Sequence, residues 1–395
     1  MAILWASGFT GLKFTEPRPM SESNWSFLTN VGLIPYSKRD SANTLYPGSL
    51  GFVADSIFPT RRNLRCIHDP QSYNSFGGFR IPFGTKPDKG LCFGFTFKSV
   101  IGPSGRNIGI CAGSYLADKI SSSNKATGWK DVNEGLVCLG TLPPAATGSS
   151  SDFCLYTDRP STTFVQPTGD FNRYKGGSVH HCEVQVDFDT KRVRVYINGK
   201  LEKDYVLSGS VDGLKQGISI FFWNESAVSA NNTTEIGNIY AISIDDIHTG
   251  RLGPAARVVD YKPVADIVKG FINGNKEAKG NYQTASQEAD SDDAYSLVAP
   301  DGGATDIYSI DPAIATDAAK IFGVSMMIRA SDPTGEGHKI APVIYKDGDT
   351  VAVNEYAASG TMQSSFVDIS KNPYTSAKWD VADIIKLGIG MRGGY

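Results

Sequence analysis

Hydrophobic and polar residues alternate most regularly between residues 181 and 207. Apolar side chains occupy every second position of two successive segments, namely Cys182, Val184, Val186 and Phe188, then Val193, Val195 and Ile197. A period of two predicts strands that each bury one face, and a slip of one residue would expose all of these side chains. Residues 189–191 predict a turn, and Asn198-Gly199 predicts a tight turn before a third strand at 201–207. We therefore expect an antiparallel meander.

Further runs predict strands on both sides of this meander. Leu91, Phe93, Phe95 and Phe97 share one face of a strand, and apolar runs follow at residues 108–112, 218–223 and 239–244. Many short strands separated by turn residues are typical of a β-sandwich. The expected fold of this part is an antiparallel jelly-roll sandwich.

The C-terminal part shows a second β pattern. Apolar residues predict three antiparallel strands around residues 324–328, 340–345 and 351–353, with a turn at Asp347-Gly348. The spacing of Trp379, Ile384, Leu387 and Ile389 then predicts a short terminal helix that closes one end of the sheet. This part is expected to be a smaller β-rich domain.

A chain of 395 residues is longer than one hydrophobic core usually supports, so we expect two domains. Glycine and proline at residues 250–254 interrupt both patterns and predict a joint there. The expected domains are residues 1–253 and residues 254–395. Within the second, residues 273–293 contain few apolar side chains and predict an extended arm or surface loop, which would contact a neighbouring subunit.

Composition agrees with an all-β protein, since 41% of residues are hydrophobic, 20% are charged and 42 are glycine. The net charge of -3 argues against nonspecific nucleic-acid binding, which needs an excess of Lys and Arg. Residues 254–395 contain 13 Lys and Arg against 19 Asp and Glu, whereas residues 1–253 contain 25 against 22. The second part is thus acidic and the first mildly basic.

The N-terminus lacks the basic start of a signal peptide, and no run approaches the about 20 apolar residues of a membrane span, so synthesis in a cytoplasm and no membrane partner are expected. Six cysteines, at positions 66, 92, 111, 138, 154 and 182, form no Cys-x-x-Cys pair. We expect all six to be reduced thiols.

Two segments carry resemblances to known families. Residues 292–392, with the runs IFGVSMMIR and KIAPVIYKDGDT, resemble a C-terminal module of structural proteins in tailed-bacteriophage virions. Residues 179–201 and 236–247 look like the central hairpins and closing strand of concanavalin-like, laminin-G-type jelly rolls. The second resemblance implies an N-terminal strand within residues 5–14 that pairs with the closing strand.

Candidate catalytic carboxylates are Glu183, Asp187 and Asp189, which project from the polar face of the predicted strand. A glycosidase would need two carboxylates about 5 to 9 Å apart. Half-buried strands routinely carry acids on their wet face, so we interpret these residues as solvated and expect no catalytic residue.

The candidate zinc ligands are His180, His181, Cys182, Cys66 and His68, because imidazole and thiolate groups bind zinc. Adjacent histidines on a strand point to opposite faces, so no zinc site is expected. Asp245-Asp246 and the aspartates of residues 187–189 could instead bind calcium, as some laminin-G-type domains do, and capping of a turn explains each of them equally well. No metal and no cofactor is expected.

Glycine-rich segments, an arginine cluster and several aromatic residues are further candidates for binding, and each also has a structural interpretation. Residues 102–106 and 176–177 are expected to be turns, because neither continues as a phosphate-binding loop. Arg61, Arg62 and Arg65 are expected to be solvated, with contact to an acidic neighbour as the alternative. Trp129, Tyr156 and Tyr174 are either sugar-stacking aromatics or core residues.

The resemblance to phage proteins implies a non-enzymatic structural component of a virion, of tail, sheath, collar or appendage type, built from copies of itself and other virion proteins. A carbohydrate-binding adhesin that contacts a host-surface glycan is the alternative, and a polysaccharide hydrolase is the third possibility. Fold class alone does not decide among them.

Overall fold

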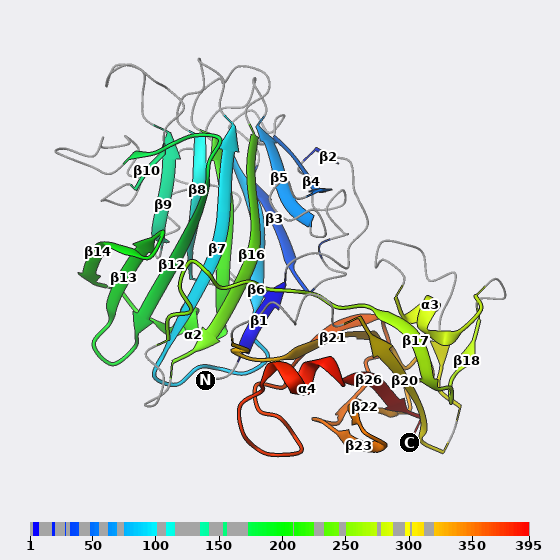
Figure 1. Cartoon of the computed structure of the whole chain (residues 1–395). Coiled ribbons are helices and arrows are strands. Elements are labelled where there is room, and N and C mark those ends of the chain that lie inside the picture. Colours follow the sequence, from blue (N-terminus) through cyan, green and yellow to red (C-terminus); the bar gives the residue numbers. More distant parts are fainter. Residues whose placement is uncertain are drawn as a thin grey trace.

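The structure is a computed structural model. It describes residues 3–7, 18–19, 28, 32–38, 48–54, 62–68, 75–100, 108–114, 135–141, 153–155, 173–207, 209–224, 233–244, 250–274, 278–286, 297–300, 302–311 and 320–394. Strands dominate these residues, and they form two large sheets beside a smaller sheet with two short ribbons (Figure 1). Every strand pair is antiparallel, which confirms the all-β prediction.

The first large sheet, called sheet 1, contains the predicted meander. Its spatial order is β14 (Lys200–Val206), β13 (Arg192–Ile197), β12 (Val179–Asp187), β7 (Gly90–Val100), β16 (Thr233–Ser243), β5 (Arg62–His68), β4 (Gly48–Ala54) and β2 (Arg18–Pro19). A further strand, β1 (Ile3–Ser7), pairs with β16. An N-terminal strand therefore pairs with the closing strand of the sandwich, as the jelly-roll resemblance implied, but it begins earlier than expected, at Ile3, and residues 8–14 lie outside the described residues.

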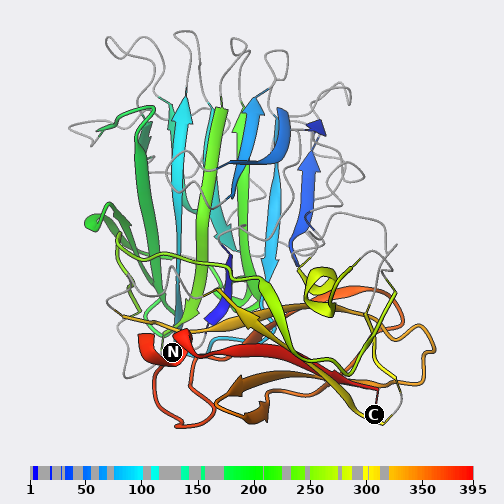
Figure 2. The same cartoon turned by 45° about the vertical axis from the view of Figure 1, so that its right-hand side comes forward.

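The second large sheet, called sheet 2, covers one face of sheet 1. Its spatial order is β11 (Arg173–Tyr174), β10 (Phe153–Leu155), β9 (Gly135–Thr141), β8 (Ile108–Ser114), β15 (Gly217–Asn224), β6 (Ser75–Pro82) and β3 (Ile34–Lys38). The chain crosses repeatedly between the sheets, for example from β6 to β7 to β8 and from β14 through helix α2 (Asp212–Gln216) to β15 and β16. Figure 2 shows the upright strands of this jelly-roll sandwich.

The sandwich core has the predicted register. All seven alternating side chains of the meander are buried, together with Leu91, Phe93, Phe95 and Phe97 of β7. They pack against Phe79, Ile110 and Ile220 of sheet 2 in one cluster. Fully burying each such side chain stabilises the fold by roughly 1.5 to 3 kcal/mol, so a one-residue slip is strongly disfavoured.

The C-terminal strands differ in pairing from the prediction. Sheet 3 has the order β17 (Pro263–Val268), β20 (Ala304–Ile310), β26 (Gly388–Gly393), β22 (Lys339–Lys346) and β23 (Asp349–Ala352), and β24 (Tyr356–Ala357) also pairs with β22. The strand predicted at 324–328 does not join this sheet. It is β21 (Ser325–Ala330), and it forms a separate ribbon with β25 (Gln363–Asp368).

The predicted turn is present, and a short terminal helix is present too, although of the four residues used to predict it only Ile384 lies within the helix. Asp347 and Gly348 have φ values of 52° and 101°, as a tight hairpin turn requires. Helix α4 (Val381–Ile385) follows Trp379, and Ile384 and Leu387 are buried with it. Ile389 is not helical, because it lies in the central strand β26, whose pairing on both sides outweighs the local helical spacing.

Part of the polar segment predicted at 273–293 is not an extended arm, while its predicted contact with a neighbouring subunit stays a prediction. Residues 278–286 contain helix α3 (Asn281–Ala285), in which Asn281 and Thr284 are buried. Another part pairs back on the chain, since β18 (Ile272–Asn273) forms a ribbon with β19 (Leu297–Val298). Buried hydrogen bonds, rather than apolar side chains, hold this segment on its own sheet.

The division into domains at residue 253 stays a prediction, but the described strands fit it. Sheets 1 and 2 use residues up to Ser243, and sheet 3 begins at Pro263. The two parts touch through β1 and β25, because the Ile3 amide donates to Asp368 Oδ1 at 3.1 Å and Ser370 Oγ at 3.0 Å. Phe366 of β25 packs against the sandwich, while its neighbour Val367 lies in the C-terminal core.

Candidate functional site: the buried Glu183 centre

Glu183 lies on the face of sheet 1 that points away from sheet 2, yet its side chain is 0% exposed. The expectation that it is solvated is therefore wrong. Residues 250–258, which lead from β16 to β17, cross this outer face and cover it (Figures 1 and 2). The predicted joint, residues 250–254, is thus part of a segment that covers a buried carboxylate. We call residues 250–258 the roof.

Four nitrogen and oxygen donors, and the Cys92 thiol at 3.8 Å, surround the Glu183 carboxylate. Its Oε1 accepts hydrogen bonds from the Tyr240 hydroxyl at 2.7 Å, the Leu252 amide at 2.7 Å and the Gly253 amide at 3.0 Å. Its Oε2 accepts from Nε of Arg251 at 3.2 Å. Three of these donors belong to the joint, so the carboxylate fastens the joint to the sandwich.

Arg251 is held from two further sides. Its guanidinium lies 3.6 Å from the centre of the Tyr196 ring on β13, and one of its terminal nitrogens donates to the Gly199 carbonyl at 3.2 Å. A guanidinium stacked on an aromatic ring keeps its in-plane donors free for acceptors. The cation therefore neutralises Glu183 from a fixed position.

Tyr240 links Glu183 to a histidine on the same face. The hydroxyl group lies 3.2 Å from Nε2 of His181, and the two rings are stacked with an interplanar angle of 22°. Tyr240 reaches across β7 at Gly94, where a built Cβ atom would lie 2.4 Å from its hydroxyl oxygen. Glycine at this position is what lets the tyrosine bridge the strands.

A β-bulge in β16 supplies a second anchor for the joint. Asn238 has φ 51°, and the pairing of β16 with β7 shifts register between Gly237 and Tyr240. Its side-chain amide donates to the Ala256 carbonyl at 2.9 Å, and its Oδ1 accepts from the Val258 amide at 2.5 Å. The joint is thus bonded to the sandwich over residues 251–258.

The charge states follow from burial and hydrogen bonding. Burial alone raises the pKa of Glu183, but the bonds from Gly253, Tyr240 and Leu252 outweigh it and leave the pKa below its ordinary value. Burial lowers the pKa of His181 despite the attraction of Glu183, and burial raises the pKa of Tyr240. At neutral pH the centre holds a carboxylate, a neutral imidazole and a neutral phenol. Such a saturated carboxylate suits a fixed anchor better than proton transfer.

The other two predicted carboxylates do not converge with Glu183. Asp187 Oδ1 accepts a hydrogen bond from the Thr190 amide at 2.8 Å and so caps the turn, and Asp189 is exposed in that turn. Asp187 is four residues from Glu183 along β12, which is about 13 Å at 3.3 Å per residue. That separation exceeds the range of a glycosidase pair.

The structure also separates the candidate metal ligands. Cys66 and Cys182 are buried in the sandwich core, whereas His181 lies on the outer face of sheet 1. Among the described residues, no group of His, Cys, Asp and Glu is placed to hold a metal ion. The His68 side chain and Asp245-Asp246 lie outside the described residues.

The structure describes only some of the remaining candidate residues from the sequence. Arg65 is not merely solvated, because its Nε donates to the buried Glu235 at 2.8 Å. Tyr174 is buried in the core, and Gly177, with φ 80°, lies in a turn as expected. The remaining candidates, Arg61, Arg62, residues 102–106, Trp129 and Tyr156, lie outside the described residues or have undescribed side chains.

Cys66, Cys92 and Cys182 are free and buried, which agrees with the reduced state predicted for them. Burial raises the pKa of all three thiols. The side chains of the other three cysteines lie outside the described residues.

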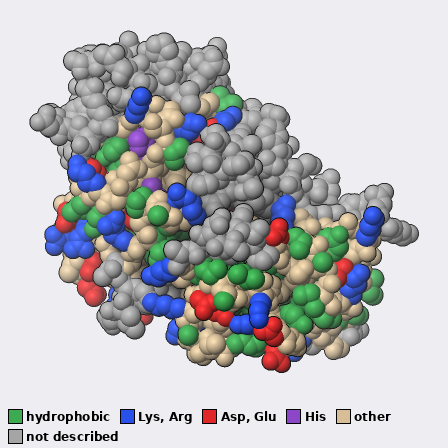
Figure 3. All heavy atoms as spheres, viewed as in Figure 1, with side chains coloured by type: hydrophobic (Ala, Val, Ile, Leu, Met, Phe, Trp, Pro, Cys, Tyr) green, Lys and Arg blue, Asp and Glu red, His purple; other side chains and the backbone are tan. Residues whose placement is uncertain are grey.

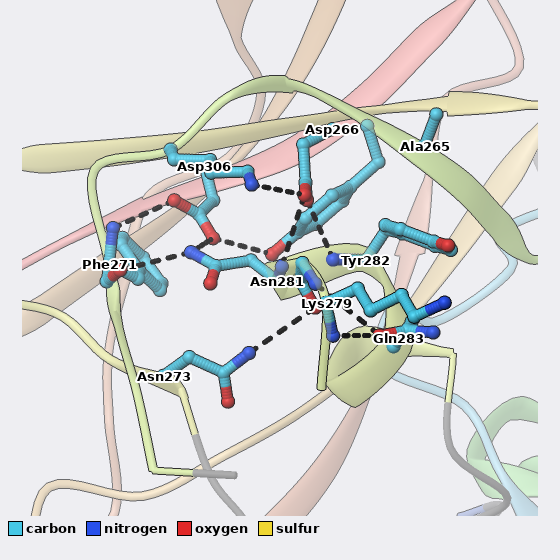
Figure 4. Close-up of polar contacts among 12 residues, drawn as sticks. Ala265, Asp266, Phe271, Asn273, Lys279, Asn281, Tyr282, Gln283 and Asp306 are labelled. Atoms are coloured by element: carbon cyan, nitrogen blue, oxygen red, sulfur yellow. Dashed lines mark hydrogen bonds and ion pairs between the residues drawn. The ribbon is translucent and has the colours of Figure 1, made fainter. Parts of the chain in front are cut away.

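Asp306 forms a second buried carboxylate centre, in sheet 3 (Figure 4). Its Oδ1 accepts from the Gly270 and Phe271 amides at 2.6 and 2.7 Å, and its Oδ2 accepts from the side-chain amide of Asn281 at 2.7 Å. Asp266 of β17 accepts from the Asn281 and Tyr282 amides at 3.1 and 2.7 Å. These bonds dock helix α3 on sheet 3.

Exposed hydrophobic side chains gather on the C-terminal part. Val264 on β17 is 45% exposed, Ile272 on β18 is 61% exposed and Val298 on β19 is 53% exposed. Ile272 and Val298 are direct cross-strand partners. Figure 3 shows hydrophobic side chains over the region where Figure 1 places β17 and β18. We call Val264, Ile267, Val268, Ile272 and Val298 the apolar patch.

Among the described residues, no helix is both long and apolar enough to cross a membrane.

Comparisons with known proteins add a weak likeness of fold. No family model and no curated protein matches the sequence. A catalytic domain of a GH131 β-glucanase from Podospora anserina matches with TM-score 0.38 and 12% identity, over 62% of this chain and 96% of that domain. The carbohydrate recognition domain of Emp47p matches with TM-score 0.32 and 14% identity, over 53% of this chain and 95% of that domain.

A sialidase structure matches with TM-score 0.31 and 12% identity, over 58% of this chain, and the matched part spans only 18% of the sialidase. TM-scores this low carry no argument about activity or ligand. The class that this chain's own strands define is an all-β protein with a jelly-roll sandwich.

Sequence reasoning missed most of the Glu183 centre. Tyr240 and Arg251 gave no signal, because their partners are distant in sequence and the cover over Glu183 is not visible in a local pattern. One usable signal was Asn238, since asparagine is among the residues that tolerate positive φ in a bulge.

Proposed function

We propose that this protein acts without catalysis, by binding copies of itself through the C-terminal part. The apolar patch is the observation that carries the proposal. Exposed apolar side chains that cluster on one part of a protein commonly mark an interface, because leaving them in water is unfavourable, and here Ile272 and Val298 lie directly opposite each other. The buried carboxylates Glu183 and Asp306 serve as anchors inside the fold, which supports a role in assembly.

Opposite charge favours a second copy as the occupant. Residues 254–395 carry 13 Lys and Arg against 19 Asp and Glu, whereas residues 1–253 carry 25 against 22. The acidic part of one copy is therefore electrostatically complementary to the mildly basic sandwich of the next. The resemblance of residues 292–392 to phage virion modules supports the finer proposal of a tail, collar or appendage component, assembled in the host cytoplasm with other virion proteins.

Sedimentation of the full chain over a range of concentrations tests this proposal. The wild type should associate, and added salt should weaken the association because it screens charge. The double variant Val264→Ser, Ile272→Ser should remain monomeric at concentrations where the wild type associates.

A matched control is Leu201→Ser with Val206→Ser, which removes exposed apolar side chains from the edge strand β14 of the sandwich. It should associate like the wild type. Circular dichroism confirms that each variant is folded. A wild type that stays monomeric at every concentration, or a patch variant that associates normally, overturns the proposal.

Carbohydrate binding by the sandwich is the second candidate function. The repeated crossing of the chain between sheets 1 and 2 is a jelly-roll arrangement, and lectin domains use such arrangements, as do viral capsid proteins. The carbohydrate-binding likenesses named above agree with this candidate but add no argument. Screening the full chain on immobilised glycans tests it, and saturable binding that free glycan competes away would favour an adhesin.

A further inference from the structure

The Glu183 centre joins four strands of the sandwich, β12, β7, β16 and β13, to the segment that leads into sheet 3. The amides of Leu252 and Gly253 donate to one oxygen of Glu183, so these two amides are held only while this carboxylate is in place and ionised. Their release would loosen residues 252–253, while Arg251 stays on Tyr196 and Gly199 and Asn238 still holds residues 256–258.

His181 lacks a hydrogen-bond acceptor for the second N–H that its imidazole would gain on protonation. Its Nε2 faces the Tyr240 hydroxyl, and its Nδ1 is buried and has no hydrogen-bond partner among the described residues. An imidazolium would carry a proton on both nitrogens, so one N–H would be left unpaired in a buried site. Opening the roof would let water satisfy it.

Every titratable or charged group that the structure places at this centre affects the balance. They are His181 and Glu183 on β12, Cys92 on β7, Tyr240 on β16, Tyr196 on β13, and Arg251 and Arg257 on the roof. The two arginines oppose a further positive charge on His181, whereas Glu183 favours it. Burial adds to the effect of the arginines.

We propose that the Glu183 centre is an acid-sensitive latch, which holds residues 252–253 on the outer face of sheet 1 at neutral pH and releases them when His181 takes up a proton. This device goes beyond the proposed assembly role and does not depend on it.

The direction follows from linkage. The pKa of His181 is below its ordinary value of about 6.5 in the closed latch, because burial disfavours the charged form, and it rises toward that ordinary value when water reaches the imidazole. The open state then binds more protons, so closure is favoured above pH 6.5 and weakens as pH falls below it. The pKa of Glu183 is also lowered, so its contribution is present above its ordinary value of about 4.3 and is lost at more acidic pH.

Hydrogen–deuterium exchange of the full chain tests the latch, because the Leu252 and Gly253 amides are its own hydrogen bonds. Between pH 7.5 and 5.5, the protection of a peptide that contains these amides should fall about tenfold after correction for intrinsic exchange. The peptides of β12 and β16 should keep their protection.

Variants separate the latch from a general loss of stability. His181→Gln cannot take up the proton and should abolish the pH response over this range. His180→Gln, which changes the neighbouring histidine outside the centre, should respond like the wild type. Tyr240→Phe keeps the ring against Gly94 but removes one donor, and should lower the protection of Leu252 and Gly253 already at pH 7.5.

Three results would overturn the latch. They are unchanged protection in the wild type down to pH 5.5, loss of protection in β12 and β16 together with the roof, and a normal response in His181→Gln. None of them depends on whether the chain assembles.

Discussion

A buried carboxylate needs strong compensation, and Glu183 has it from four donors. Two are backbone amides, one is a phenol and one is a guanidinium, and all lie between 2.7 and 3.2 Å from the carboxylate. Removing one partner of such a buried charged group is more damaging than removing both, because the remaining groups stay unsatisfied. At the scale of single residues, stability therefore depends more on Glu183 than on the exposed acids near it.

Replacing Glu183 with Ala should destabilise the protein by about 1 to 3 kcal/mol or more, because the buried Tyr240 hydroxyl and two part-buried amides would lose their acceptor. Urea denaturation followed by tryptophan fluorescence measures the loss. Asp187→Asn is the matched control on the same strand, and it should cost much less because this carboxylate caps an exposed turn. Equal losses for the two variants would contradict the anchoring role.

Among the elements, helix α3 shows how a polar segment becomes ordered. Asp306 and Asp266 present acceptors to the start of this short helix, and Asn281 places its amide and its side chain between them (Figure 4). Gly280, which directly precedes the helix, lies so close to Asp266 that a Cβ atom at this position would clash with Oδ2 of Asp266. Buried hydrogen bonds replace the apolar face that the segment lacks.

Asn281→Ala should release helix α3 while sheet 3 stays folded, because it removes the side-chain donor to Asp306. Trypsin cleavage after the exposed Lys279 reports the release and should become several times faster. Ala285→Ser, at an exposed position of the same helix, should cleave at the wild-type rate. Unchanged cleavage in Asn281→Ala would show that the helix does not depend on these bonds.

At the scale of the whole molecule, β25 connects two hydrophobic cores through the alternation of a strand. Phe366 packs against the sandwich clusters and Val367 packs in the C-terminal core. The roof over Glu183 and the Ile3 amide add polar contacts between the same parts. The two parts are therefore expected to stabilise each other.

Phe366→Ala should weaken this coupling. Its cost should be below the about 3 to 5 kcal/mol of a fully buried Phe→Ala change, because Phe366 is only partly buried. Calorimetry should show melting of the two parts further separated than in the wild type. Ile385→Ala, at an exposed position of helix α4, is the control and should leave the melting profile unchanged.

The sequence by itself determined the local β pattern. The register of β12 and β13, the turn at Asp347-Gly348 and the all-β class were predicted correctly, because alternation and turn chemistry act between near neighbours. The helix predicted near Trp379 was also correct. Local spacing fails only where a distant strand competes for the same residues, as at Ile389.

Only the tertiary structure decided which polar residues are buried. Glu183 and Asp187 look alike in sequence, yet residues 250–258 cover the first and leave the second at an open turn. Strand partners such as β21 with β25, and the docking of α3 on Asp306, also join residues far apart in the chain. These contacts join residues that are far apart in the sequence, and a local pattern of hydrophobic and polar residues does not specify which distant segments meet.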